Sequence, residues 1–160
     1  MRKLITILGT LLIAVTILIS GSAVAPWVTW IYEENTSDTD YINGAPNGYY
    51  ASLGKNGPPA VLGLVVLDLG AANAMGPNQQ FTVFADSSVS ENYTVAVSET
   101  AEDDGVEVGS GEDTQNHTFY TPSTPRKSWR YIILTGTSGV TAYAGGDYYY
   151  GPDIDAVGWY

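Results

Sequence analysis

Beyond residue 26, apolar residues recur in short runs that clusters of Gly, Pro, Asn, Asp and Ser separate, without a helical period. In YTVAVS at 93–98, apolar and polar residues alternate, which predicts a strand with Tyr93, Val95 and Val97 on its packed face. The run VLGLVVLDL at 61–69 does not alternate and predicts a central strand. Eight runs rich in β-branched and aromatic residues are predicted strands: 27–32, 61–69, 81–85, 93–98, 105–109, 117–121, 129–136 and 153–160. This spacing predicts an all-β fold, an antiparallel β-sandwich or jelly roll with little helix, in which the first and last strands lie near each other.

The first 25 residues have a different pattern. Arg2 and Lys3 precede an apolar run from Leu4 to Ile19, and the small residues GSAVA follow at 21–25. This layout is typical of a secretory signal peptide. We therefore expect a signal peptide at 1–25 and a single domain at 26–160, secreted to the extracellular space or the cell surface. An uncleaved membrane anchor is the alternative, although the run falls somewhat short of the roughly 20 residues that span a bilayer.

Composition narrows the classes of partner. The chain of 160 residues has no cysteine, which excludes disulfides and thiolate metal sites. Its formal net charge is −11, and the predicted signal peptide contains two of only six basic residues. Nucleic acid and anionic membrane surfaces need clustered Lys and Arg and are therefore disfavoured. Cations, sugars and other proteins remain as partners.

Six segments occur in the order found in one known family. They are NGAPNGYYASLG at 43–54, LDLG at 67–70, QFTVFA at 80–85, YTVAVS at 93–98, WRYIILTGTSG at 129–139 and PDIDAVGW at 152–159. Together they resemble the galactose-binding-like (discoidin or F5/8 type C-like) β-sandwich domains of bacterial and archaeal secreted surface proteins. Two positions depart from that pattern, since Asn47 and Ala85 stand where the family has acidic residues. The resemblance implies a carbohydrate-binding, adhesion or structural module, and it implies no catalysis.

The residues themselves also give no support to an enzyme. His117 is the only histidine and lies in a predicted strand, where an ordinary cross-strand role is expected. No Ser-His-Asp arrangement with supporting context and no His-rich metal spacing occurs in the sequence. We therefore expect a protein without catalytic residues.

The closing stretch DIDAVGW raises the question of why a buried strand contains two carboxylates. Alternation places Asp153 and Asp155 on the same face as Val157 and Trp159, so a core-facing strand would bury Asp155. Such a carboxylate needs a cation or several N–H donors. The first alternative is a structural Ca²⁺, which galactose-binding-like domains often hold between the first loop and the last strand. Its ligands would be Asp153 and Asp155 with Asp38, Asp40 and Asn43, and also Asn47, from the first loop. The second alternative is that both carboxylates cap loop amides without a metal.

Tyrosines cluster near the same two segments. DYYYG at 147–151 reads as a loop in which Tyr148, Tyr149 and Tyr150 cannot all face the core, so at least one ring is expected to be exposed. Tyr49 and Tyr50 of the first loop are expected at the same end of the sandwich. An exposed tyrosine ring stacks well on a sugar, and tyrosine is equally common in protein interfaces.

Two functions remain open on the sequence alone. The first is a secreted lectin-like module that binds a glycan or cell-surface polymer, and the second is a structural subunit of a surface layer or filament that binds copies of itself. Three Asn-x-Ser/Thr sequons, at Asn35, Asn92 and Asn116, are candidate glycosylation sites in an exported chain.

Overall fold

The structure is a computed structural model that describes residues 27–55, 59–140, 142–144 and 147–159, with only the backbone described in 142–144 and 147–149. The predicted signal peptide at 1–25 lies outside the described residues. Within the described residues, no helix is long and apolar enough to span a bilayer.

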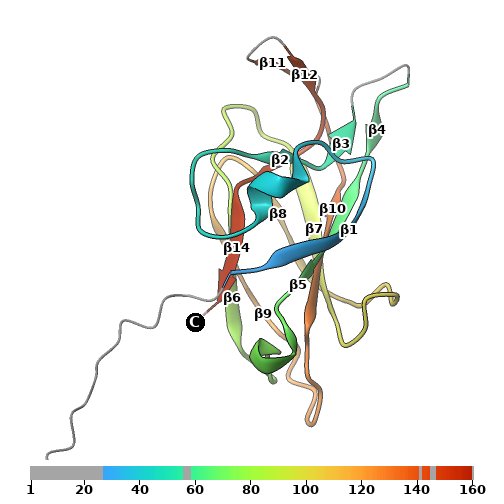
Figure 1. Cartoon of the computed structure of the whole chain (residues 1–160), viewed down its shortest axis with the longest axis vertical. Helices are drawn as coiled ribbons and strands as arrows, with labels where there is room; N and C mark the ends of the chain where they lie inside the picture. The colour runs from blue at the N-terminus through green and yellow to red at the C-terminus, as the bar shows by residue number, and fades with distance from the viewer. Residues whose placement is uncertain (1–26, 56–58, 141, 145–146, 160) are drawn as a thin grey trace, which may run out of the picture.

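Two antiparallel sheets pack against each other as a β-sandwich (Figure 1). The larger has five strands in the order β1-β5-β10-β7-β8, and the smaller has three in the order β14-β6-β9. The larger sheet contains β1 (Thr29–Glu34), β5 (Leu64–Asp68), β10 (Tyr131–Gly136), β7 (Asn92–Ser98) and β8 (Val106–Glu112). The smaller contains β14 (Ala156–Trp159), β6 (Gln80–Phe84) and β9 (His117–Tyr120). The all-β sandwich expected from the sequence is confirmed.

Short elements gather at the upper end of the sandwich in Figure 1, which we call the loop end. They are the 3-10 helix η1 (Thr39–Ile42), the pair β2 (Ala51–Ser52) and β13 (Asp153–Ile154), the pair β3 (Gly54–Lys55) and β4 (Val61–Leu62), and the hairpin β11 (Ala142–Ala144) and β12 (Asp147–Tyr149). A second 3-10 helix, η2 (Ala71–Asn73), lies near the opposite end.

The core lies between the inner faces of the two sheets. Tyr93, Val95 and Val97 are fully buried, as the alternation in β7 predicts. Phe81 and Val83 of the facing sheet belong to the same cluster. Each of the eight predicted runs contains a strand, and an isolated bridge between Trp27 and Gly158 confirms that the two ends of the domain meet.

Two details differ from the prediction. The run 61–69 is divided between β4 and β5 at Gly63, where a Cβ atom would lie 2.3 Å from the carbonyl oxygen of Asn35. The interpretation of DYYYG as a loop is wrong, because residues 147–149 form β12 and pair with β11. In the sequence, the segments 142–144 and 147–149 stand on either side of Gly145-Gly146, and a Gly-Gly pair between two strands is typical of a β-hairpin.

Candidate functional site

The first loop is fastened to the last strand by one carboxylate. Asp155 lies between β13 and β14, is only 7% exposed, and accepts hydrogen bonds from the main-chain N–H groups of Asn47 (2.9 Å) and Gly48 (3.1 Å). Asn47 in turn accepts the main-chain N–H of Tyr49 through its Oδ1 atom, at 2.8 Å. Consecutive N–H groups held in this way fix the path of the loop. Asp155 is therefore buried, as alternation predicts, and it caps loop amides.

Two tyrosines stand on this fixed loop and its neighbour η1. The rings of Tyr41 and Tyr49 stack with their centroids 5.3 Å apart and an interplanar angle of 28°. Both rings stay accessible, with Tyr41 42% exposed and Tyr49 62% exposed. We call Tyr41 and Tyr49 the tyrosine pair. It is a stack of two partly exposed aromatic rings at the surface.

The helix η1, which contains Tyr41, is anchored on β1. The indole Nε1 of Trp30 donates to Asp40 at 3.0 Å, and the main-chain N–H of Trp30 donates to Oδ1 of Asn43 at 2.9 Å. These bonds hold η1 beside the edge strand β1. Tyr41 is therefore held through η1 and β1, and Tyr49 through its loop and Asp155.

The predicted Tyr50 and Tyr150 are less accessible than Tyr49. Tyr50 is half-buried, and burial, together with the charges of Asp86, Asp155 and Asp153, raises the pKa of its phenol. Tyr150 is also half-buried, and its ring packs so close to Gly139 that a Cβ atom there would lie 2.8 Å from it. Tyr49 and Tyr50 do lie at the same end as Tyr150, because β2 pairs with β13. The side chains of Tyr148 and Tyr149 lie outside the described residues.

The five predicted calcium ligands are not assembled into one site. Among the described residues, no group of three or more His, Cys, Asp or Glu side chains is placed to hold a metal ion. Asp40 and Asn43 accept hydrogen bonds from Trp30 instead. Asp155 accepts hydrogen bonds from loop amides, and Asp38 is an exposed residue that precedes η1. As placed, these residues fit the amide-capping alternative for Asp155 better than a shared ion, and calcium stays a prediction.

Asp153, which is half-buried, belongs instead to a set of carboxyl groups with the buried Glu91 and Asp113, which the sequence did not reveal. Asp113 is fully buried and accepts the main-chain N–H groups of Glu91 and Asp153, both at 2.9 Å. Glu91 accepts the N–H of Val140, and Asp153 accepts the hydroxyl of Ser52. We call Glu91, Asp113 and Asp153 the acidic cluster. Burial is the main cause that raises the pKa of all three carboxyl groups.

The acidic cluster connects three parts of the loop end. Through Val140 and Asp153 it holds the segments on either side of the β11–β12 hairpin, and through Glu91 it reaches the start of β7. No local pattern points to it, since its members are 22 and 40 residues apart in the chain. Its role is structural, because its oxygens already accept hydrogen bonds from three main-chain N–H groups and from the hydroxyl of Ser52.

The remaining predicted residues occupy ordinary surface or strand positions. Asn35, Asn92 and Asn116 are all exposed, which leaves the three sequons as predicted glycosylation sites. His117 in β9 accepts the main-chain N–H of Glu112 and packs edge-on against Tyr93, which is the cross-strand role expected for it.

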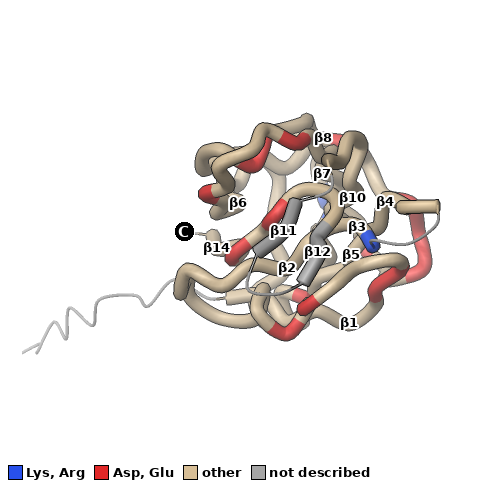
Figure 2. Tube along the Cα trace, turned by 90° about the horizontal axis from the view of Figure 1, so that it is seen from above, with Lys and Arg blue, Asp and Glu red and all other residues tan. Residues whose placement is uncertain are grey.

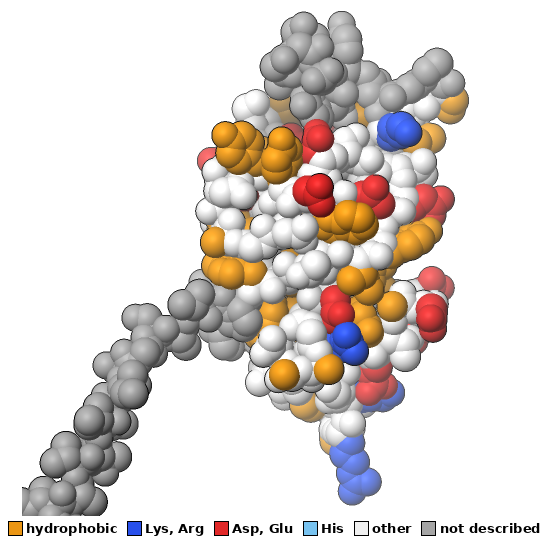
Figure 3. Space-filling view, viewed as in Figure 1, with side chains coloured by type: hydrophobic (Ala, Val, Ile, Leu, Met, Phe, Trp, Pro, Cys, Tyr) orange, Lys and Arg blue, Asp and Glu red, His pale blue; other side chains and the backbone are white. Residues whose placement is uncertain are grey.

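Negative charge surrounds the loop end. Figure 2 shows acidic residues on several of its segments and few basic residues. In Figure 3, acidic side chains lie among hydrophobic ones on the face that contains β1. A bound anion would meet unfavourable electrostatics here.

Two solved structures share this fold. One is the CBM32 of AlyQ in complex with 4,5-unsaturated mannuronic acid, with 17% sequence identity, a TM-score of 0.50, and coverage of 85% of this chain and 95% of that chain. The other is the C-terminal domain of a chitobiase from Bacteroides fragilis, with 12% identity, a TM-score of 0.50, and coverage of 86% and 95%. No protein-family model and no curated protein matches the chain. The two similarities confirm the galactose-binding-like β-sandwich fold that the sequence motifs indicate.

Proposed function

We propose that the chain is an exported, non-catalytic module that binds a glycan or another cell-surface polymer through the tyrosine pair. One observation carries the proposal: two exposed rings stack on each other, and one of them, Tyr49, stands on a loop that a buried carboxylate holds in place. Stacking fixes the orientation of both rings before a ligand arrives, so little conformational entropy is lost when a sugar ring packs on them.

The surroundings of the tyrosine pair favour a hydroxyl-rich ligand. Asp40 is next to Tyr41 in the chain, and the side chain of Asn47 lies close enough to bond the N–H of Tyr49. Carboxylate and amide groups can exchange hydrogen bonds with sugar hydroxyls while the rings cover an apolar sugar face. These are the two kinds of contact that a sugar site needs.

The charge of the domain favours a neutral glycan over an acidic one. The formal net charge is −11, and the loop end is rich in carboxylates. The CBM32 of AlyQ was solved with an unsaturated mannuronic acid, which is an anion. We propose that this chain differs in ligand charge, because a uronate would be repelled at its loop end.

The test is binding to immobilised neutral and uronic-acid oligosaccharides, followed by titration with the best ligand. Replacing Tyr49 by Ala removes one ring of the pair and is expected to weaken binding about ten-fold. Tyr49→Phe keeps the ring and should retain most of the affinity. Tyr120→Ala is the matched control, since Tyr120 is 58% exposed on β9 of the smaller sheet. Equal losses for Tyr49→Ala and Tyr120→Ala, or no glycan bound at all, would refute the proposal.

The alternative function, a subunit that binds copies of itself, also has a structural feature in its favour. Both edge strands of the larger sheet carry exposed hydrophobic residues, Ile31 on β1 and Val106 on β8. Apolar side chains exposed in this way can pack against another copy of the chain. Sedimentation velocity on the glycan-free protein tests this function. A sedimentation coefficient that stays at the value of a monomer at all concentrations would exclude it.

A further inference from the structure

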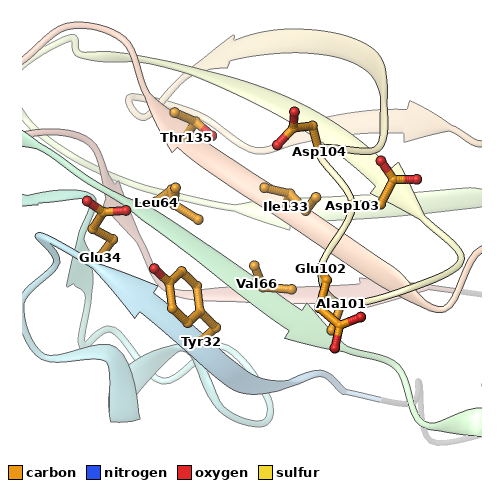
Figure 4. A pocket seen from close by; sticks show the side chains of 10 residues that line it. All are labelled: Tyr32, Glu34, Leu64, Val66, Ala101, Glu102, Asp103, Asp104, Ile133 and Thr135. Carbon is orange, nitrogen blue, oxygen red and sulfur yellow. The ribbon is translucent and has the colours of Figure 1, made fainter.

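A groove crosses the outer face of the larger sheet, and we call it the side groove (Figure 4). Its volume is about 480 Å³, which is within the range of small-ligand sites. It is lined by residues of β1, β5 and β10 and by the segment 101–104 between β7 and β8. None of its lining residues belongs to the tyrosine pair or to the acidic cluster.

The floor of the groove is set by the strand register. Tyr32 pairs with Val66, and Val66 pairs with Ile133, so these three side chains form one row across the sheet. Glu34, Leu64 and Thr135 form the next row in the same way. Because alternate residues share a face, both rows point into the groove, as Figure 4 shows. The middle of the floor is therefore aliphatic, with an aromatic ring beside it.

Carboxylates stand at both ends of this aliphatic floor. Glu34 lies at the β1 end, and Asp103 and Asp104 lie at the opposite end, beyond Ile133 (Figure 4). Two strand spacings, about 10 Å, separate β1 from β10, and because Asp103 and Asp104 lie beyond β10, the two ends are more than this distance apart. A fourth acidic residue, Glu102, also lines the groove beside Asp103 in the chain. All four acidic side chains are exposed, and within the described residues none of them forms an ion pair with Lys or Arg.

We propose that the side groove binds a linear aliphatic polyamine. A polyamine has cationic nitrogens at its ends and methylene groups between them, which matches the order carboxylate, aliphatic floor, carboxylate. An extended triamine such as spermidine spans a distance comparable to the groove. Its ammonium groups pair with Glu34 at one end and with Asp103 and Asp104 at the other. The ring of Tyr32 adds a favourable face for an ammonium group.

The same lining argues against a sugar in this groove. The side chains of Leu64, Val66 and Ile133 in the middle of the floor offer no hydrogen-bonding atoms, so hydroxyl groups placed there would lose hydrogen bonds to water, whereas methylene groups would not. The side groove and the tyrosine pair therefore recognise different chemistry.

The test is calorimetric titration of the protein with spermidine at physiological ionic strength. The double variant Asp103→Asn/Asp104→Asn and the single variant Glu34→Gln each remove charge from one end of the groove. The double variant is expected to weaken binding about ten-fold, and Glu34→Gln several-fold. The double variant Asp86→Asn/Glu107→Gln removes the same number of exposed carboxylates outside the groove and should change the affinity by less than about two-fold. Butylamine, with one ammonium group, should bind more weakly than spermidine.

Methyl NMR on Leu64, Val66 and Ile133 locates the ligand, and unchanged melting curves show that the variants fold. Shifts at these three residues, which need about ten-fold more spermidine in Asp103→Asn/Asp104→Asn, would support the proposal. Equal losses in the two double variants would show diffuse attraction to an acidic protein and would overturn it. No spermidine binding, or tighter binding of a basic peptide or a glucosamine oligomer at the same methyl groups, would also overturn it.

Discussion

Asp155→Asn is the sharpest perturbation of the loop end. The substitution keeps the size and shape of the side chain but leaves one oxygen where the carboxylate has two, and both carboxylate oxygens accept main-chain hydrogen bonds. Either the N–H of Asn47 or that of Gly48 then faces an NH₂ group. The variant therefore loses one charge-assisted hydrogen bond at a site that is only 7% exposed.

The size of the effect follows from that lost bond. A hydrogen bond to a charged group contributes about 1.5–3 kcal/mol, so we expect the free energy of unfolding to fall by about 2 kcal/mol. For a domain of this size, that loss lowers the melting temperature by roughly 7 °C. Because Asn47 positions Tyr49, the proposed glycan should also bind more weakly to Asp155→Asn.

Differential scanning calorimetry measures the melting temperature, and Asp103→Asn is the matched control. It removes the same charge from an exposed position where, among the described residues, the carboxylate accepts only a long hydrogen bond, 3.5 Å from the main-chain nitrogen of Gly105. Equal melting temperatures for Asp155→Asn and Asp103→Asn would refute the capping role.

Repeating the scans in EDTA tests the calcium predicted from the sequence. The capping geometry needs no ion, so we expect Asp155→Asn to lower the melting temperature in EDTA as much as in calcium. A linked ion present at 100 times its dissociation constant would instead stabilise the wild-type protein by about 2.7 kcal/mol. A melting temperature that falls in EDTA for the wild type but not for Asp155→Asn would therefore show a structural calcium ion.

Two other predictions concern stability. In the folded state, the pKa values of the three carboxyl groups of the acidic cluster are raised above the ordinary values of 3.8 for Asp and 4.5 for Glu. At a pH above these ordinary values, the folded state therefore binds more protons than the unfolded state. The free energy of unfolding should therefore increase as the pH is lowered from 7 to 4.5, which urea titrations can measure. A free energy of unfolding that decreases over this range would contradict the prediction. Below pH 3.8 the trend should reverse, because the hydrogen bond from Arg130 lowers the pKa of Asp68 and that stabilisation is lost on protonation. Separately, Gly54→Ala should cost about 1–3 kcal/mol in the same titrations, since its Cβ atom would lie 2.1 Å from the carbonyl oxygen of Tyr150. Gly76→Ala, whose Cβ atom meets nothing within 4 Å, is the control, and equal effects would disprove the steric argument.

The sandwich was predictable because strands impose a period of two on the sequence. In β7 the fully buried Tyr93, Val95 and Val97 alternate with more accessible residues, except that Ser98 is buried where the strand ends. The same reasoning placed Asp155 in the interior, since it shares a face with Val157. Local pattern and tertiary packing agree at these positions, and prediction succeeds there.

The candidate site was less predictable because its geometry depends on contacts distant in sequence. Tyr41 was missed, since η1 has no periodic pattern and its ring finds Tyr49 only after the loop has been fixed by Asp155. The acidic cluster was missed for the same reason. Its members lie in three separate segments, and nothing near Asp113 in the sequence indicates that two main-chain N–H groups will meet its carboxylate.

The contact between Asp155 and the first loop also affects the order of folding. Its two hydrogen bonds join residues 108 and 107 positions apart, so they close almost the largest loop that the domain contains. Such contacts form late and slow the folding of β-sandwiches. During synthesis, Tyr41 and Tyr49 appear more than a hundred residues before the carboxylate that holds the loop of Tyr49. Nascent chains that end before Asp155 should therefore lack a formed tyrosine pair, and glycan recognition should begin only when the final strand has docked.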